Sequence, residues 1–124
     1  MLSMKLRLRV FVIVLLLCLG MLLSGTAPVK ADNLPVVDIT ARRFAFSPDK
    51  ITLKKGQTVK LRLHSEDVTH GFFLRPLKLD EEIPAGQTTN VMVTPQEAGS
   101  FTTICDHFCG PNHGNMNMTI VVEE

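Results

Sequence analysis

Two cysteines, two histidines and a methionine lie close together near the end of this 124-residue chain. They fall within one twelve-residue segment, CDHFCGPNHGNM, and are Cys105, His107, Cys109, His113 and Met116. Thiolate, imidazole and thioether groups are the ligands that select copper or zinc over hard cations. The segment therefore predicts a site for a soft or borderline metal ion.

One upstream histidine could complete such a site. His70 lies in the run Asp67-Val68-Thr69-His70-Gly71-Phe72, where the alternation of the preceding strand gives way to a loop. His64 differs, because it falls on the charged face of the alternating run 58–64 and is predicted to be a surface residue. We therefore expect His70 to join the cluster and His64 to stay outside it.

Several kinds of site are compatible with these residues. Two cysteines in an exported domain often form a disulfide, but a disulfide gives no reason for the other ligands to share the loop. Zinc sites commonly use two Cys and two His at a different spacing, and a thioether adds little to them. A mononuclear copper centre would use His70, Cys109, His113 and Met116 and leave Cys105 unused, whereas two coppers could share both thiolates.

The rest of the chain after residue 31 is predicted to be all-β. Short runs of alternating apolar and polar residues are separated by turns rich in Gly and Pro, and no helical period extends over a useful length. The runs include 36–39, 42–46, 51–53, 58–64, 88–94, 100–104 and 118–123, with 77–87 as a connection and turn. About seven or eight strands at this spacing are typical of a Greek-key β-sandwich.

The first 31 residues are predicted to be a secretory signal peptide. Basic residues at positions 5, 7 and 9 precede an apolar run over 10–23, and Val29 and Ala31 fit the small-residue pattern of a cleavage site. An uncleaved anchor formed by residues 10–25 is the alternative, although a spanning helix needs about 20 apolar residues. Residues 32–124 would then form one exported domain, on the periplasmic or extracellular face.

Charge and aromatic content argue against a nucleic-acid partner. The chain has 13 Lys and Arg against 12 Asp and Glu, and it has no Trp and no Tyr. Removal of the signal would leave a mildly acidic domain whose basic residues are scattered. A domain without a basic patch or an aromatic stacking surface is not expected to bind nucleic acid, and membrane contact is expected only if the N-terminal segment is retained.

The loop spacing C-x3-C-x3-H-x2-M, together with the upstream His70, resembles the dinuclear CuA domain of cytochrome c oxidase subunit II, a cupredoxin. The resemblance covers roughly the last 90 residues, and the combination of loop and upstream histidine is highly specific. It implies a cupredoxin-like Greek-key β-sandwich in which Cys105 and Cys109 bridge two copper ions. His70 and Met116 would complete one copper.

The resemblance also implies that His113 and the backbone carbonyl of residue 107 complete the other copper. In the family, position 107 usually carries Glu, so His107 departs from the pattern and is expected to act through its carbonyl, as a surface imidazole or as a spare ligand. The domain also lacks the family's Trp and Tyr patch and its two-helix membrane hairpin. A free-standing or singly anchored relative is therefore expected.

The predicted function is an exported electron-transfer module that is not itself an enzyme, although it could be a subunit of a cytochrome c oxidase-type complex. It would take electrons from a redox protein donor, such as a cytochrome c-like protein, and pass them to an acceptor such as a terminal oxidase. A copper carrier or assembly protein, a mononuclear type 1 copper protein and a metal-free sandwich with a disulfide are the alternative hypotheses.

Overall fold

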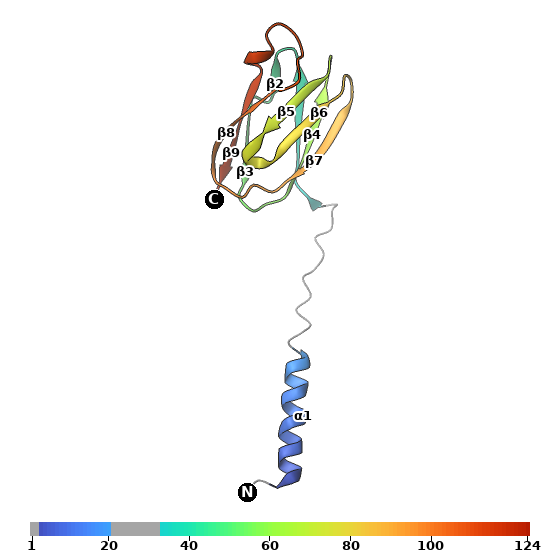
Figure 1. Ribbon diagram of the computed structural model, residues 1–124, viewed down its shortest axis with the longest axis vertical. Helices are drawn as coiled ribbons and strands as arrows, with labels where there is room; N and C mark the ends of the chain where they lie inside the picture. Colours follow the sequence, from blue (N-terminus) through green and yellow to red (C-terminus); the bar gives the residue numbers. More distant parts are fainter. Residues whose placement is uncertain (1–2, 21–32) are drawn as a thin grey trace. The chain divides into compact units, whose positions relative to one another are not determined.

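A computed structural model describes residues 3–20 and 33–124. The chain divides into two compact units, residues 1–31 and residues 32–124. The first unit contains the helix α1 (Met4–Gly20) and the second contains all of the strands in the described residues (Figure 1). The predicted cleavage motif at residues 29–31 lies outside the described residues, so the signal peptide stays a prediction.

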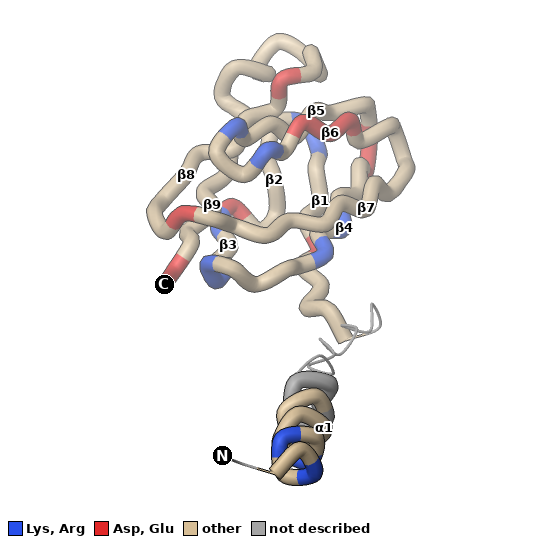
Figure 2. Tube along the Cα trace, turned by 60° about the horizontal axis from the view of Figure 1, so that its bottom comes forward, with Lys and Arg blue, Asp and Glu red and all other residues tan. Residues whose placement is uncertain are grey.

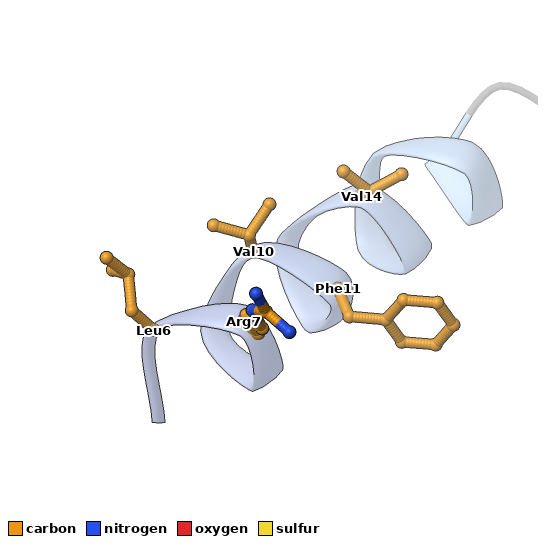
Figure 3. Close-up of a pocket in the computed structure, with 5 residues that line it drawn as sticks. All are labelled: Leu6, Arg7, Val10, Phe11 and Val14. Atoms are coloured by element: carbon orange, nitrogen blue, oxygen red, sulfur yellow. The ribbon is translucent and has the colours of Figure 1, made fainter. Parts of the chain in front are cut away.

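The helix α1 carries exposed apolar side chains, among them Phe11 and Leu15. A shallow hollow of about 270 Å³ runs along it and is lined by Leu6, Arg7, Val10, Phe11 and Val14, all from this one helix (Figure 3). Apart from Arg7, the hollow offers no side chain that could donate or accept a hydrogen bond. Within the described ranges, no helix combines the length and the apolar character needed to cross a membrane.

The strands of the second unit form two sheets that pack as a β-sandwich, as predicted. The four-stranded sheet has the order β2-β1-β4-β7, and the five-stranded sheet has the order β3-β9-β8-β5-β6 (Figure 1). Their bounds are β1 (Val36–Arg42), β2 (Ala45–Ser47), β3 (Lys50–Lys54), β4 (Val59–Ser65), β5 (His70–Leu74), β6 (Leu79–Ile83), β7 (Thr88–Val93), β8 (Gly99–Ile104) and β9 (Asn117–Glu123).

The core forms because alternate residues of each strand face the opposite sheet. In β4, Val59, Leu61 and Leu63 are buried, whereas Arg62 between them is exposed. In β9, Met118, Ile120 and Val122 are buried in the same way. The alternation seen in the sequence therefore marks the face of each strand that packs into the sandwich.

Pairing between strands joins distant parts of the chain. β4 pairs with β7 in the antiparallel manner, but β1 pairs with β4 and β3 pairs with β9 in the parallel manner. Residues 79–83 form strand β6 against β5, where the sequence predicted a connection. The alternation is hidden there because Asp80, Glu81 and Glu82 fill the positions between the buried Leu79 and Ile83.

The segment between β8 and β9 projects from one end of the sandwich, opposite the end where the C-terminus lies (Figure 1). This segment, residues 105–116, is called the ligand loop below. In the described part of the domain, Lys and Arg are spread over several strands and turns rather than gathered in one patch (Figure 2). The sandwich thus presents the predicted metal ligands on a loop held at both ends by neighbouring antiparallel strands.

Candidate metal centre

The ligand loop is closed at its base by strand pairing. β8 ends at Ile104, and the next backbone N–H, that of Cys105, donates to the carbonyl of Met116 at 3.1 Å. Both residues face the interior, with Cys105 only 3% and Met116 only 1% exposed. The first and last predicted ligands of the loop are therefore brought together by the β8–β9 register itself.

The second half of the loop folds back through a short 3-10 helix, η4 (His113–Asn115). The N–H of His113 donates to the carbonyl of Gly110 at 3.1 Å, and the N–H of Met116 donates to the carbonyl of His113 at 3.1 Å. Gly110 has a φ of 143°, and a Cβ on it would lie 2.8 Å from the ring of Phe44. Only glycine fits this turn without moving that ring.

Two thiols lie at the centre of the cluster. The sulfurs of Cys105 and Cys109 are 3.7 Å apart, and both cysteines are free. Nδ1 of His70, the first residue of β5, lies 3.9 Å from the Cys105 sulfur. On the other side, Nδ1 of His113 and Sδ of Met116 each lie 3.8 Å from the Cys109 sulfur. Five of the six predicted site residues therefore converge through their side chains.

His107 is oriented differently from the other five. Its carbonyl oxygen lies 3.2 Å from the Cys105 sulfur, but its side chain is exposed and its Nδ1 lies 3.2 Å from the carbonyl of Phe108. His107 also lines a hollow together with Gly71, Asp106 and the acidic residues of β6. The structure thus brings the backbone of residue 107 to the cluster and leaves its imidazole outside.

Asp67 orients the ring of His70. The Asp67 carboxylate accepts hydrogen bonds from Nε2 of His70 and from the N–H groups of Val68 and Arg43, each at 2.7 Å. Burial alone would raise the pKa of Asp67, but these hydrogen bonds lower it to about 2. With Nε2 donating to the carboxylate, Nδ1 keeps its lone pair toward Cys105, which is the arrangement that metal-binding histidines use.

The Cys109 thiol is held in its protonated form at neutral pH. Burial, together with the neighbouring Cys105 thiol, raises the pKa of Cys109 to about 11. A metal ion that binds here must displace the proton from this sulfur, as thiolate ligation requires. In the metal-free chain Cys109 is therefore not poised as a reactive thiolate.

The donor set fits copper. His70, Cys105 and Cys109 are buried, and their ligand atoms lie within 4.8 Å of one another. Two thiols, two imidazole nitrogens and a thioether in one cluster match the soft and borderline donors that copper prefers over hard cations. Asp67 lies only three residues before His70, but its role as the hydrogen-bond partner of that ring was not predicted from the sequence. Arg43 was not predicted either, because its contact with Cys109 spans 66 positions and no local spacing reveals it.

The fold and the cluster define the class to which the protein belongs. The chain is a member of the cupredoxin-like domain family, whose model matches residues 12–122. Within that class it is similar to cytochrome c oxidase subunit 2 of Thermus thermophilus, with 33% identity over 92 residues that cover 74% of this chain and 68% of the relative.

Two further comparisons agree. Cytochrome c oxidase subunit 2 from a second strain of Thermus thermophilus is also 33% identical over 92 residues, which cover 74% of this chain but 55% of that relative. The periplasmic domain of subunit II of cytochrome oxidase from Bradyrhizobium japonicum has the same fold, with a TM-score of 0.66 and 16% identity over 73% of this chain and 84% of that one.

Proposed function

We propose that this chain is an electron-transfer domain that holds a pair of copper ions between Cys105 and Cys109. The observation that carries the proposal is the symmetry of the cluster. Two free sulfurs lie 3.7 Å apart, and each has an imidazole nitrogen nearby, 3.9 Å away in His70 on one side and 3.8 Å away in His113 on the other. A mononuclear centre would leave one of the two sulfurs without a role.

The proposed ligand set uses every donor that the loop turns inward. Cys105 and Cys109 would bridge both coppers, His70 and Met116 would complete one, and His113 with the carbonyl of residue 107 would complete the other. The 3.2 Å separation between that carbonyl and the Cys105 sulfur supports the backbone role. A pair of coppers between two shared thiolates would take up and release one electron.

The proposed reaction is a one-electron relay. One electron leaves a reduced haem protein of the cytochrome c type and passes through this domain to a haem–copper oxidase. The donor is oxidised by one electron, the acceptor is reduced by one, and no covalent bond forms or breaks. The domain could be a subunit of such an oxidase, as its named relatives are.

Phe108 and His113 offer a short route from the cluster to the surface. His113 contacts the Cys109 sulfur, and its ring lies 5.8 Å from the ring of Phe108 at a 50° tilt. Phe108 is 73% exposed. An exposed aromatic ring beside a ligand would give a partner an apolar contact close to the metal, which suits a short-lived redox complex.

The N-terminal segment is proposed to direct export. The helix α1 begins with basic residues at positions 5, 7 and 9 and continues with exposed apolar ones. That order is typical of a secretory signal. Comparing the mass of the chain recovered from an expressing cell with that of the full sequence would reveal cleavage after Ala31, whereas an intact mass would favour the anchor.

Metal analysis of the full-length chain tests the function. After reduction and copper loading, we expect two copper ions per chain, a purple colour, and in the one-electron oxidised form an EPR signal split by two equivalent copper nuclei. One copper per chain would contradict the dinuclear proposal. Two coppers without a reversible one-electron couple would instead favour a copper carrier.

Replacing Met116 by Leu should keep both coppers and change the reduction potential. The thioether sulfur lies 3.8 Å from the Cys109 sulfur in a position 1% exposed, so Leu fills a similar volume without a donor atom. Thioethers are weak ligands that tune copper potentials. Voltammetry and copper analysis of Met116→Leu should find a shifted potential and two bound coppers. Complete loss of metal would show that Met116 is a principal ligand.

A further inference from the structure

Arg43 connects the β1–β2 turn to the ligand loop. Its Nε donates to the backbone carbonyl of Cys109 at 2.8 Å, across 66 positions of sequence. Arg43 as a whole is exposed, but this hydrogen bond is partly buried. The guanidinium therefore lies against the backbone of one of the two central thiols.

The backbone of the same residue reaches the second ligand-bearing segment. The N–H of Arg43 donates to Oδ2 of Asp67 at 2.7 Å, and Oδ1 of that carboxylate accepts from Nε2 of His70 at 2.7 Å. The next residue, Phe44, packs against Gly110 so closely that a Cβ there would come within 2.8 Å of its ring. Arg43 thus bridges the segment that carries His70 and the loop that carries Cys109.

The charge of Arg43 is available to the cluster. Over residues 33–124, no carboxylate lies within ion-pair distance of its guanidinium, whereas Arg62 is paired with Asp38 at 2.6 Å. A positive charge here would favour the more negative form of any group held between the thiols.

We propose that Arg43 is a positioning residue that holds the Cys109 carbonyl in place and raises the reduction potential of the copper centre. The inference rests on the proposed function, because it concerns the same centre. Reduction adds one negative charge to the cluster. The nearby guanidinium stabilises that reduced form, and its removal should make the centre a stronger reductant.

Arg43→Gln is the informative variant, because glutamine keeps a hydrogen-bond donor and loses the charge. Arg42→Gln is the matched control, since Arg42 is an adjacent exposed arginine at the end of β1, paired with Ala45. Arg43→Lys keeps the charge and changes the donor geometry. The full-length chain of each variant is loaded with copper, and its potential is measured by voltammetry alongside metal content and EPR.

We expect the reduction potential of Arg43→Gln to lie about 28 to 59 mV below that of the wild type. This shift corresponds to about a threefold to tenfold change in the one-electron equilibrium constant. The metal content and the splitting by two nuclei should be unchanged, Arg42→Gln should match the wild type, and Arg43→Lys should recover most of the shift. A wild-type potential in Arg43→Gln, or an equal fall in Arg42→Gln, would overturn the role of Arg43 and leave the copper proposal standing. A wild-type chain without a copper pair would overturn both.

Discussion

Replacing Cys109 by Ser is expected to abolish the two-copper centre. The Cys109 sulfur lies 3.7 Å from the Cys105 sulfur and 3.8 Å from both His113 Nδ1 and Met116 Sδ, so it is the atom that most of the donor set shares. Serine retains the size but offers a hard oxygen that copper binds poorly. Elemental analysis should find at most one copper per chain, and the splitting by two nuclei should disappear.

Cys105→Ser should give a different result from Cys109→Ser. It removes the sulfur next to His70 but leaves Cys109, His113 and Met116 together, which with His70 is the ligand set of a mononuclear blue centre. We therefore expect one copper per chain and a blue rather than purple colour. If Cys105→Ser left the stoichiometry and the EPR signal unchanged, Cys105 would not be a ligand, and the proposal that both thiolates are shared by the two coppers would fail.

His107→Ala serves as the matched control within the same loop. The His107 ring is exposed and lies outside the cluster, whereas its carbonyl faces Cys105. Alanine keeps that carbonyl, so the colour and both coppers should be retained. A bleached site would mean that the imidazole itself binds metal, and the loop would then have to rearrange on copper binding.

The sequence predicted the sandwich where the strands alternate clearly. In β4 and β9, buried residues alternate with less buried ones, and the sequence predicted both strands. β6 was missed, because an edge strand of sequence LDEEI buries only its two ends and places Glu81, which is half-buried, between them. The parallel pairing of β1 with β4 could not be predicted from the sequence either, because strand pairing depends on contacts between distant residues rather than on the local pattern.

The site was predictable to the extent that its donors share one loop. The spacing between Cys105 and Met116 is local, and the β8–β9 pairing brings its two ends together. His70 required an inference across 35 positions of sequence, and the structure places it 3.9 Å from the Cys105 sulfur. Arg43 lies in no recognisable motif, and its contact with Cys109 emerges only when the β1–β2 turn packs on the loop.

Gly71→Ala is expected to disturb the ligand cluster, because a side chain at position 71 would collide with the ligand loop. Gly71 donates its N–H to the Cys105 sulfur at 3.4 Å, and a Cβ on it would overlap Oδ1 of Asp106 and lie 2.7 Å from the backbone nitrogen of His107. The Asp106 side chain can rotate away, but the backbone of residue 107 has to move, and its carbonyl faces Cys105. We expect a loss of about 1–3 kcal/mol in the free energy of unfolding of the metal-free chain and weaker copper retention.

Gly114→Ala is the matched control for this prediction. Gly114 lies in η4 of the same loop, and a Cβ there would meet no atom within 4 Å. Alanine at an unstrained position reduces the freedom of the unfolded chain, so this variant should be unchanged or up to about 1 kcal/mol more stable. Urea unfolding of the metal-free variants, followed by copper titration, makes the comparison. Equal stability and equal copper binding in both would show that the loop backbone near His107 can shift freely, and that close packing against β5 does not fix the carbonyl beside Cys105.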